Sequence, residues 1–425
     1  MKRQVICDDK AQGTDSEGNE DRGKFFIIDS RIWARATACG MNEAAAYLVL
    51  ASGTGKDNKT TEWSTQSVMT YAGMGWNRAK DAMDGLIAAG IIRCATGYTA
   101  SKPLYEMASF QELIEYETAK NPPRLLDALE RALLSRLREG IQPASRAERN
   151  RAERLLQNRQ LLKDAKGVYL TPELIKNDPG ENLIWLPNSI VNGTSSGEES
   201  PVRRLRSAGC VRTLRLFVNL YSAHNLRDDG GISPRLIRTN FDRQMIGQQG
   251  AYIVWGFKTS EKGWGTLWEK GPFAGFEPAK PGEKAPVWVS VELLQSMGLL
   301  SFVPHIFEND TKTAEPIHSY GIAGVGEALE QEIGNAANLA ARAMALPSKL
   351  TEAAEGGFEY FCPVLKTIPA VQMIGVGRLT YRPNTRRTKA WFAELHNTAP
   401  EWIQTYADLL SRADIASGRR QMNFG

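Results

Sequence analysis

The fold of this chain is decided between Ser64 and Gly90, where the sequence reads STQSVMTYAGMGWNRAKDAMDGLIAAG. Ser64 stands directly before a short helical pattern over residues 65–72, and its hydroxyl is suited to accept a hydrogen bond from a free N–H of the first turn. Residues 73–75 predict a tight turn. A further helix is expected over residues 77–89, and Gly90 is placed to end it in the left-handed conformation that glycine tolerates best.

The sequence on either side extends this pattern. An apolar helix is expected over residues 43–51, followed by a polar loop over 53–61 and a short strand at 62–63. After Gly90, residues 91–92 begin a strand, 96–102 form a loop and 104–107 return. The predicted order is therefore helix, strand, helix, tight turn, helix and hairpin.

This order resembles the winged helix-turn-helix superfamily. The resemblance covers residues 43–107 and depends on Ser64, the turn at 73–75, the helix 77–89 with Gly90, and one apolar face made of Ala79, Ala82, Met83, Leu86 and Ile87. It implies that the helix 77–89 enters a major groove of DNA while the loop 96–102 lies over a phosphate or the minor groove.

The opposite face of the helix 77–89 carries the candidate base contacts, Asn77 and Arg78, because asparagine pairs with adenine and arginine with guanine. Asp81 and Asp84 share that face and weaken its attraction to phosphate. Further candidate DNA-binding residues are Thr65 and Gln66, whose backbone N–H groups begin the preceding helix, and the basic side chains of Lys80, Lys102, Arg203, Arg204 and Arg206, the last three expected in a polar loop. The alternative interpretation is a winged helix used for protein contacts.

Part of the pattern recurs further along the chain. Residues 43–64 align without a gap with 212–233, and the end of the first pattern, from Leu86 to Ile92, aligns with Leu294 to Leu300. The strand expected over 25–33 matches 182–190. Ser233 and Pro234 predict the start of the second helix of this copy. The recurrence predicts a second winged-helix module in which extra residues separate the second helix from the third.

The expected fold class is α+β and helix-rich. We predict five parts: a disordered tail over residues 1–24, a winged-helix DNA-binding domain over 25–109, a basic helical linker over 110–170, a second winged-helix-like domain over 171–325 with an insertion at 240–285, and a small C-terminal α/β region over 326–425. Within the linker, helices are expected over 122–138 and 145–166, and Ser145 with Glu148 forms a capping-box pattern.

In the C-terminal region, a helix is expected over residues 327–345 and another over 401–412. Residues 358–379 alternate in the manner of strands, with turns at Gly375 and Gly377. A basic loop over 381–389 precedes Trp391. Either this tryptophan stacks on single-stranded nucleic acid or it belongs to a core beside a solvated turn.

Composition excludes several classes of protein. The chain has 425 residues, of which 42% are hydrophobic and 24% charged, with a formal net charge of +4, which is typical of a soluble protein of about three domains. It contains no apolar run long enough for a membrane span. Its five cysteines lack zinc-site spacing, its four histidines are isolated (His224, His305, His318 and His396), and no catalytic motif is present. The sequence therefore predicts a cytoplasmic protein that is not an enzyme and has no cofactor or metal.

With its second copy, the arrangement resembles the tandem winged-helix replication initiators of plasmids and phages. This resemblance implies a sequence-specific double-stranded DNA-binding protein, either a replication initiator or a transcriptional regulator of a mobile element, acting as a homodimer or with a partner protein. The alternative is a non-catalytic subunit of a larger protein or nucleoprotein assembly, in which the winged helices serve as docking surfaces.

Overall fold

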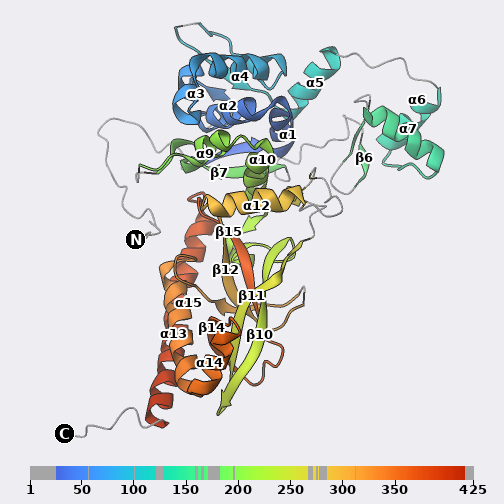
Figure 1. The fold of residues 1–425 in the computed structure, drawn as a ribbon. Coiled ribbons are helices and arrows are strands. Elements are labelled where there is room, and N and C mark those ends of the chain that lie inside the picture. The colour runs from blue at the N-terminus through green and yellow to red at the C-terminus, as the bar shows by residue number, and fades with distance from the viewer. Residues whose placement is uncertain are drawn as a thin grey trace. The chain divides into compact units, whose positions relative to one another are not determined.

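The computed structural model is a mixed α+β protein (Figure 1). It describes residues 25–55, 57–99, 101–120, 128–157, 161–163, 167–170, 182–194, 197–266, 271–273, 276, 285–311 and 313–416. The predicted tail over residues 1–24 lies outside these residues, and so do residues 417–425. The fold divides into two compact units. The N-terminal unit comprises Glu20–Ser222 and Lys270–Ser290, and the described residues of the C-terminal unit fall within Ala223–Glu269 and Val291–Gly425.

The first half of the N-terminal unit follows the predicted element order. Its elements are α2 (Met41–Ser52), β2 (Thr60–Thr61), α3 (Thr65–Ala72), α4 (Trp76–Ala88), β3 (Ile92–Cys94) and β4 (Tyr105–Met107). The three strands form one antiparallel sheet in the order β2-β4-β3. Helix α2 lies at the centre of the unit, with every residue from Ala44 to Ala51 buried, because its sequence there is apolar on all sides.

Ser64 caps α3 as expected. Its side chain accepts a hydrogen bond from the N–H of Gln66, and its own N–H donates to the hydroxyl of Ser67. The left-handed Gly73 ends the helix. Gly90 also adopts a left-handed conformation, with φ of 72°, two residues after the end of α4. The local sequence signals at both helix ends are therefore confirmed.

A pair of strands lies beside these helices. Strand β1 (Phe25–Asp29) runs antiparallel to β7 (Leu183–Pro187), so each of the two segments that the recurrence matched contains a strand, and these strands pair with each other. The strand expected over 25–33 is wrong after Asp29, because Asp29 caps helix α1 (Ser30–Cys39) there. Strand β7 leads into α8 (Ser189–Asn192), α9 (Pro201–Ala208) and α10 (Val211–Leu220). The expected polar loop holding Arg203, Arg204 and Arg206 is thus wrong. It is helix α9, which Ser200 caps, Pro201 begins, and Val202 and Leu205 anchor by burial.

The linker contains more structure than two helices. Its helices are α5 (Phe110–Lys120), α6 (Ala128–Arg138) and α7 (Arg146–Gln157), and a small hairpin joins β5 (Leu162–Lys163) to β6 (Tyr169–Leu170). The capping box is confirmed, because Glu148 N–H donates to the Ser145 hydroxyl and Ser145 N–H to the Glu148 carboxylate. Leu133, Leu137, Leu155 and Leu161 close a small core of this segment with Ala152 and Tyr169. The predicted helix over 145–166 is therefore too long.

The C-terminal unit is built on one antiparallel sheet. In chain order its elements are β8 (His224–Asn225), α11 (Leu226–Asp229), β9 (Gly231–Ile232), β10 (Ile237–Gln249), β11 (Tyr252–Thr266), β12 (Leu300–Phe307), β13 (Pro316–Ser319), α13 (Ala328–Met344), α14 (Pro347–Glu355), β14 (Tyr360–Leu365), β15 (Gln372–Leu379) and α15 (Arg386–Ala416). The strand order is β13-β12-β15-β10-β11-β14, while β9 also pairs with β15 and β8 pairs with β9. Helix α12 (Pro286–Ser296) crosses in sequence from one unit to the other.

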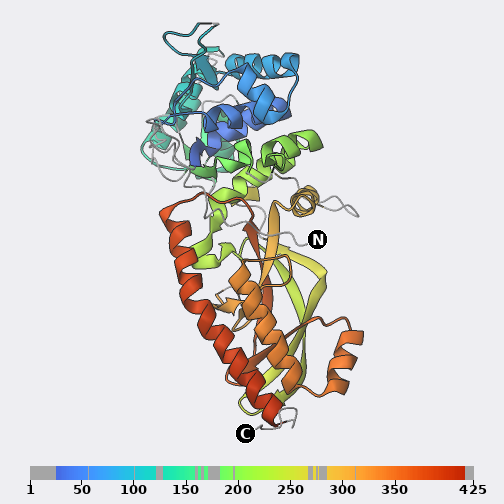
Figure 2. The ribbon, with the colours of Figure 1, turned by 90° about the vertical axis from the view of Figure 1, so that its left-hand side faces the viewer.

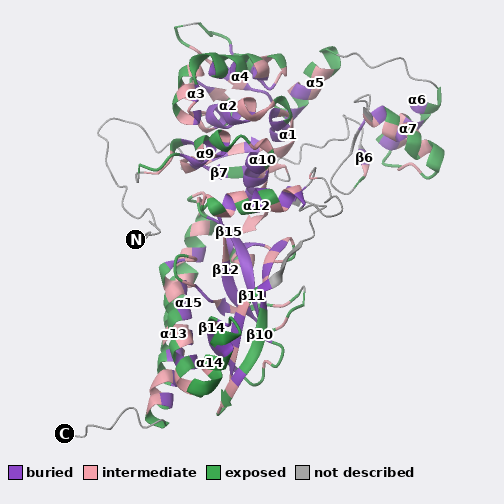
Figure 3. Cartoon of the chain, in the orientation of Figure 1, coloured by how far each residue is buried: buried purple, intermediate pink, exposed green. Residues whose placement is uncertain are grey.

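Helices pack against this sheet, including α14, whose Ala353 contributes to a core with strands β10 and β11. Helices α13 and α15 run side by side along the sheet, as both views show (Figures 1 and 2). Their apolar residues, including Ile333, Ala337 and Tyr406, pack with Phe257, Met373 and other strand residues into one core. Strand β15 is buried along its whole length, whereas α15 presents an exposed face (Figure 3).

The expected second winged-helix module does not form as predicted. Helices α10 and α12 occupy two of its expected helical positions, but the helix predicted to start at Ser233 is absent. Its place is taken by β10, in which Ile237, Thr239 and Phe241 are buried at alternate positions. That alternation favours a strand and overrides the capping pattern of Ser233 and Pro234. The predicted insertion supplies most of the β10–β11 hairpin.

The C-terminal residues also differ from expectation. Helix α13 and the two strands β14 and β15 are confirmed, but they join the same sheet as β10 to β13 and do not form a separate small region. The turns predicted at Gly375 and Gly377 lie inside β15. At Gly375 a Cβ atom would lie 1.9 Å from Thr239 Oγ1 on the adjacent strand, so glycine permits the close approach of the two strands. One long helix, α15, contains residues 386–389 of the predicted loop and the whole of the predicted helix 401–412. Pro400 lies inside it. Among the described residues, none of the helices combines the length and hydropathy needed to cross a membrane.

Candidate functional site

The first candidate site lies on α4. Ala79, Ala82, Met83 and Leu86 are buried and hold the helix on α2 and α3, while Asn77, Arg78 and Lys80 are exposed. The sequence-predicted base contacts therefore lie on the solvent face of a well-anchored helix. Gly75 begins α4 without a side-chain cap, and its surroundings are open.

The charges on the α4 face balance. Arg78 and Lys80 are matched by Asp81 and Asp84, and Lys80 Nζ lies 3.6 Å from the Asp84 carboxylate one turn away. Both partners of this pair are more than half exposed, so the pair contributes little to stability. Trp76, at the first position of the helix, is 54% exposed. The face thus offers hydrogen-bonding groups and an aromatic ring but no net positive charge.

The start of α3 serves a different purpose from the one predicted. The Gln66 N–H donates to the Ser64 hydroxyl and is already used by the helix cap. The expectation that this N–H binds a phosphate is therefore wrong, although the Gln66 side chain is exposed. Thr65 is half-buried beside it.

Positive charge comes instead from α9. Arg206 donates from Nε to the Ala72 carbonyl at 2.6 Å and from Nη2 to the Gly73 carbonyl at 2.8 Å, so it binds the carboxyl end of α3. Arg203 lies over the turn between α3 and α4, since a Cβ on Gly73 would lie 2.6 Å from its Nε. Burial lowers the pKa of Arg206, and the positive charges of Arg78 and Arg203 lower it further. Three predicted site residues from distant parts of the sequence therefore come together.

Lys102 is exposed in the loop between β3 and β4, where its N–H donates to Thr99. In the same loop, the Tyr98 ring packs against Tyr105 with ring centroids 5.3 Å apart. Arg204 is half-buried on α9.

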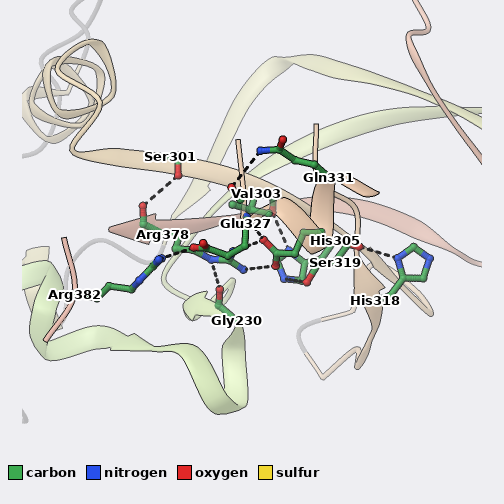
Figure 4. Close-up of polar contacts among 12 residues, drawn as sticks. Gly230, Ser301, Val303, His305, His318, Ser319, Glu327, Gln331, Arg378 and Arg382 are labelled. Carbon is green, nitrogen blue, oxygen red and sulfur yellow. Dashed lines mark hydrogen bonds and ion pairs between the residues drawn. The ribbon is translucent and has the colours of Figure 1, made fainter. Parts of the chain in front are cut away.

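The second candidate is a buried polar network in the C-terminal unit (Figure 4). Arg378 on β15 donates to both carboxylate oxygens of Glu330 on α13, at 2.6 and 3.0 Å, and its Nε donates to the Gly230 carbonyl at 2.9 Å. The Glu330 carboxylate also accepts the N–H of Glu327, which itself pairs with Arg382. The Trp391 ring lies 5.0 Å from the guanidinium carbon of Arg378.

Histidines extend this network. His305 bonds through Nδ1 to the Val303 carbonyl and through Nε2 to the Ser319 hydroxyl. His318, which directly precedes Ser319, contacts the Tyr406 hydroxyl through Nε2 at 2.6 Å. That hydroxyl lies 3.4 Å from Cys362 Sγ. These contacts tie β12, β13 and β14 to α15 and give the buried polar groups of these residues hydrogen-bond partners.

Burial sets the charge states in the network. It lowers the pKa of His305 to about 4, assisted by the charge of Arg378, and lowers that of His318 to about 4. Burial alone would raise the pKa of Glu330, but the charge and hydrogen bonds of Arg378 outweigh it and hold this pKa at about 2. At neutral pH the core thus holds neutral histidines beside a fully formed ion pair. The donors and acceptors satisfy one another, and the arrangement is that of a structural tie between strands and helices.

Sequence reasoning missed this network. It treated the histidines as isolated, although the pairing of β12 with β13 places His305 opposite Ser319 and His318 on the adjacent strand. Two signals pointed to it: an arginine near the end of the otherwise apolar strand QMIGVGRL, and a glutamate on the buried side of the Ala-rich helix α13. For Trp391, the core interpretation holds, because the ring is 8% exposed and lies against Arg378 and Arg382.

No family model matches the chain, and no curated protein or solved structure matches it. Within the described part of the chain, no group of three or more His, Cys, Asp or Glu side chains is placed to hold a metal ion.

Proposed function

We propose that the chain is a non-catalytic protein that binds double-stranded DNA through its N-terminal unit, with α4 in a major groove. The observation that supports this most strongly is the exposed face of α4. Asn77 and Arg78 point to solvent from a helix whose other face is fully buried, so they can meet base edges without rearrangement of the helix.

The surrounding elements support the same proposal. Residues 41–107 run helix, strand, helix, helix and hairpin, with the sheet order β2-β4-β3, and this order resembles that of a winged helix. In that layout the β3–β4 loop with Lys102 lies beside the groove-binding helix and contacts the DNA backbone. Arg203 and Arg206 place positive charge at the α3–α4 turn, which offsets the neutral balance of α4 itself.

The resemblance to replication initiators and transcriptional regulators of mobile elements belongs to the same proposal. Both roles require a sequence-specific complex with a duplex, and neither requires a covalent step. The mechanism is positioning: α4 reads bases, while Lys80, Lys102 and the arginines of α9, including Arg204, bind phosphates.

The test is binding of the full chain to duplexes selected from a random pool, measured by fluorescence anisotropy over a range of salt concentrations. We expect Arg78→Ala to lower the affinity for the selected site by on the order of 1–3 kcal/mol and to relax the preference at one base position. Asp81→Ala on the same face is the matched control, and it should not weaken binding. An isotherm of the Arg78→Ala variant equal to that of the wild type would reject the assignment.

One observation favours a second candidate function, a non-catalytic assembly subunit that docks another protein. The α4 face has no net charge and begins with the exposed Trp76, and aromatic side chains are enriched at protein interfaces. The salt series separates the two functions. Absence of binding to every duplex at low salt supports the docking function, whereas log affinity that falls steeply with log salt supports DNA binding.

A further inference from the structure

Two guanidinium groups lie at the turn between α3 and α4, and a third arginine follows the turn on α4. Arg206 is fixed by its two hydrogen bonds to the end of α3, Arg203 packs over Gly73, and Arg78 stands in the first turn of α4. The lowered pKa of Arg206 has burial as its main cause and the charges of Arg78 and Arg203 as further causes, so the local potential is positive. Like charges so close together favour an anion at this place.

A carboxylate of the chain already stands there. Glu199 precedes the cap of α9 by one residue, and its Oε1 lies 3.1 Å from Arg203 Nε. The two side chains are 55% and 44% exposed, so the pair is accessible from solvent and weakly held. The charge of Glu199 also opposes the lowering of the pKa of Arg206, so the carboxylate acts on a second arginine of the cluster.

We propose that Glu199 occupies the place of a DNA phosphate in the free protein and leaves it when a duplex binds. A carboxylate and a phosphodiester each present two oxygens and one negative charge to a guanidinium fork, so one can replace the other on Arg203. The inference rests on the proposed function and adds a specific competitor to it: every duplex must displace Glu199 from Arg203 before the backbone reaches the α3–α4 turn.

The direct test compares Glu199→Gln with Glu198→Gln. Glu198 is exposed and adjacent in sequence, so the two variants change the net charge equally, but Arg203 pairs with Glu199. Anisotropy titration of the full-length variants with one duplex, at fixed salt, is the measurement. We expect Glu199→Gln to tighten binding roughly twofold to fivefold more than Glu198→Gln does, which is the size of an exposed ion pair. Equal affinities of the two variants would overturn the proposal.

A double-mutant cycle locates the effect. In the Arg203→Ala background, Glu199→Gln should no longer tighten binding, because the group that the carboxylate blocks has been removed. Arg203 is exposed and its removal leaves the α9 cap Ser200 and the buried Val202 and Leu205 in place, so the variant is expected to fold. A Glu199→Gln effect of undiminished size without Arg203 would contradict the proposed competition.

Failure of the proposal and failure of DNA binding give different results. If the wild-type chain binds no duplex at low salt, the proposed function is rejected. The anion site is then tested by calorimetry with inorganic phosphate, which we expect to bind the Glu199→Gln variant more tightly than the Glu198→Gln variant. Equal binding of inorganic phosphate to both variants would reject the site as well.

Discussion

Arg378 and Arg203 carry the same side chain in opposite circumstances. Arg378 is 2% exposed, and its guanidinium binds Glu330 through two hydrogen bonds and Gly230 through a third. Arg203 is exposed and pairs with the exposed carboxylate of Glu199 at 3.1 Å, and its charge acts on the neighbouring Arg206. The first arginine is occupied by its own fold, whereas the second retains hydrogen-bonding capacity for a ligand.

The contrast distinguishes a charge that holds the fold together from a charge that is open to a ligand. A buried charge with its full set of partners reports how the fold is held together, because removing either partner leaves an uncompensated charge in the core. A gathering of like charges at a surface turn is the opposite case, because the charges repel one another and an anion relieves that repulsion.

The largest effect is expected from opening the buried pair. Arg378→Ala should lower the free energy of unfolding by about 3–5 kcal/mol, because Glu330 remains charged inside the core. Denaturant unfolding followed by tryptophan fluorescence is the measurement. The double variant Arg378→Met with Glu330→Leu should lose less than Arg378→Ala alone. A loss below about 1 kcal/mol for Arg378→Ala would show that the buried pair resembles a surface pair after all.

Acid is expected to weaken the same network. Burial holds the pKa of His305 and of His318 at about 4, below the 6.5 of an unperturbed histidine. Between these pH values the two rings bind protons in the unfolded chain but not in the folded chain. Stability is therefore fully present above pH 6.5 and falls as the pH drops towards 4, by about 1.4 kcal/mol per pH unit for each ring. Glu330 adds a further loss only below about pH 4.5.

Unfolding curves at pH 7, 6 and 5 measure this slope, and His318→Phe should reduce it. The control variant is His396→Phe, because His396 is exposed on α15. This variant should keep the full slope. A free energy of unfolding that stays constant from pH 7 to pH 5 would disprove the assignment of neutral buried histidines.

Arg206 lies between the two extremes of the comparison, since it is half-buried and has carbonyl partners but no carboxylate in contact. Arg206→Ala should destabilise the N-terminal unit by about 1–2 kcal/mol through loss of two charge-assisted hydrogen bonds. Thermal unfolding measures this change, with Arg203→Ala as the matched variant on the same helix. We expect Arg203→Ala to have the smaller effect on stability and the larger effect on DNA affinity, and the reverse order would contradict the division of roles.

The smallest change in stability is expected at Lys80, whose pair with Asp84 is exposed on both sides. Lys80→Ala should alter the free energy of unfolding by less than about 0.5 kcal/mol. If Lys80 binds a phosphate, the same variant should reduce the slope of log affinity against log salt by about 1. A slope equal to that of the wild type would remove Lys80 from the interface.

The parts of the fold that the sequence predicts are those with local causes. Helix α3 has the expected bounds because Ser64 caps it and Gly73 ends it, and α13 follows from the spacing of its apolar residues. The local signals failed where distant contacts decide. Ser233 and Pro234 have the pattern of a helix start, but the residues after them enter a sheet whose neighbouring strand β15 comes from more than a hundred positions later in the sequence.

The candidate sites divide in the same way. Asn77 and Arg78 were found because they lie on one face of a periodic helix. The convergence of Arg203 and Arg206 on the α3–α4 turn depends on how α9 packs against α2 and α3, and sequence spacing carries no information about it. The His305–Ser319 and Arg378–Glu330 contacts likewise join strands and helices whose pairing the sequence pattern does not specify.

The buried ion pair depends on two residues that lack side chains. A Cβ on Gly334 would lie 2.0 Å from the Gly321 carbonyl oxygen, and one on Gly321 would lie 2.5 Å from the backbone of α13. Helix α13 can therefore touch bare backbone at this crossing, and that contact sets how far Glu330 reaches towards Arg378. A single methyl group added at either glycine would push α13 away from the backbone at Gly321. It would thereby separate the Glu330 and Arg378 side chains, although neither charged residue had been altered.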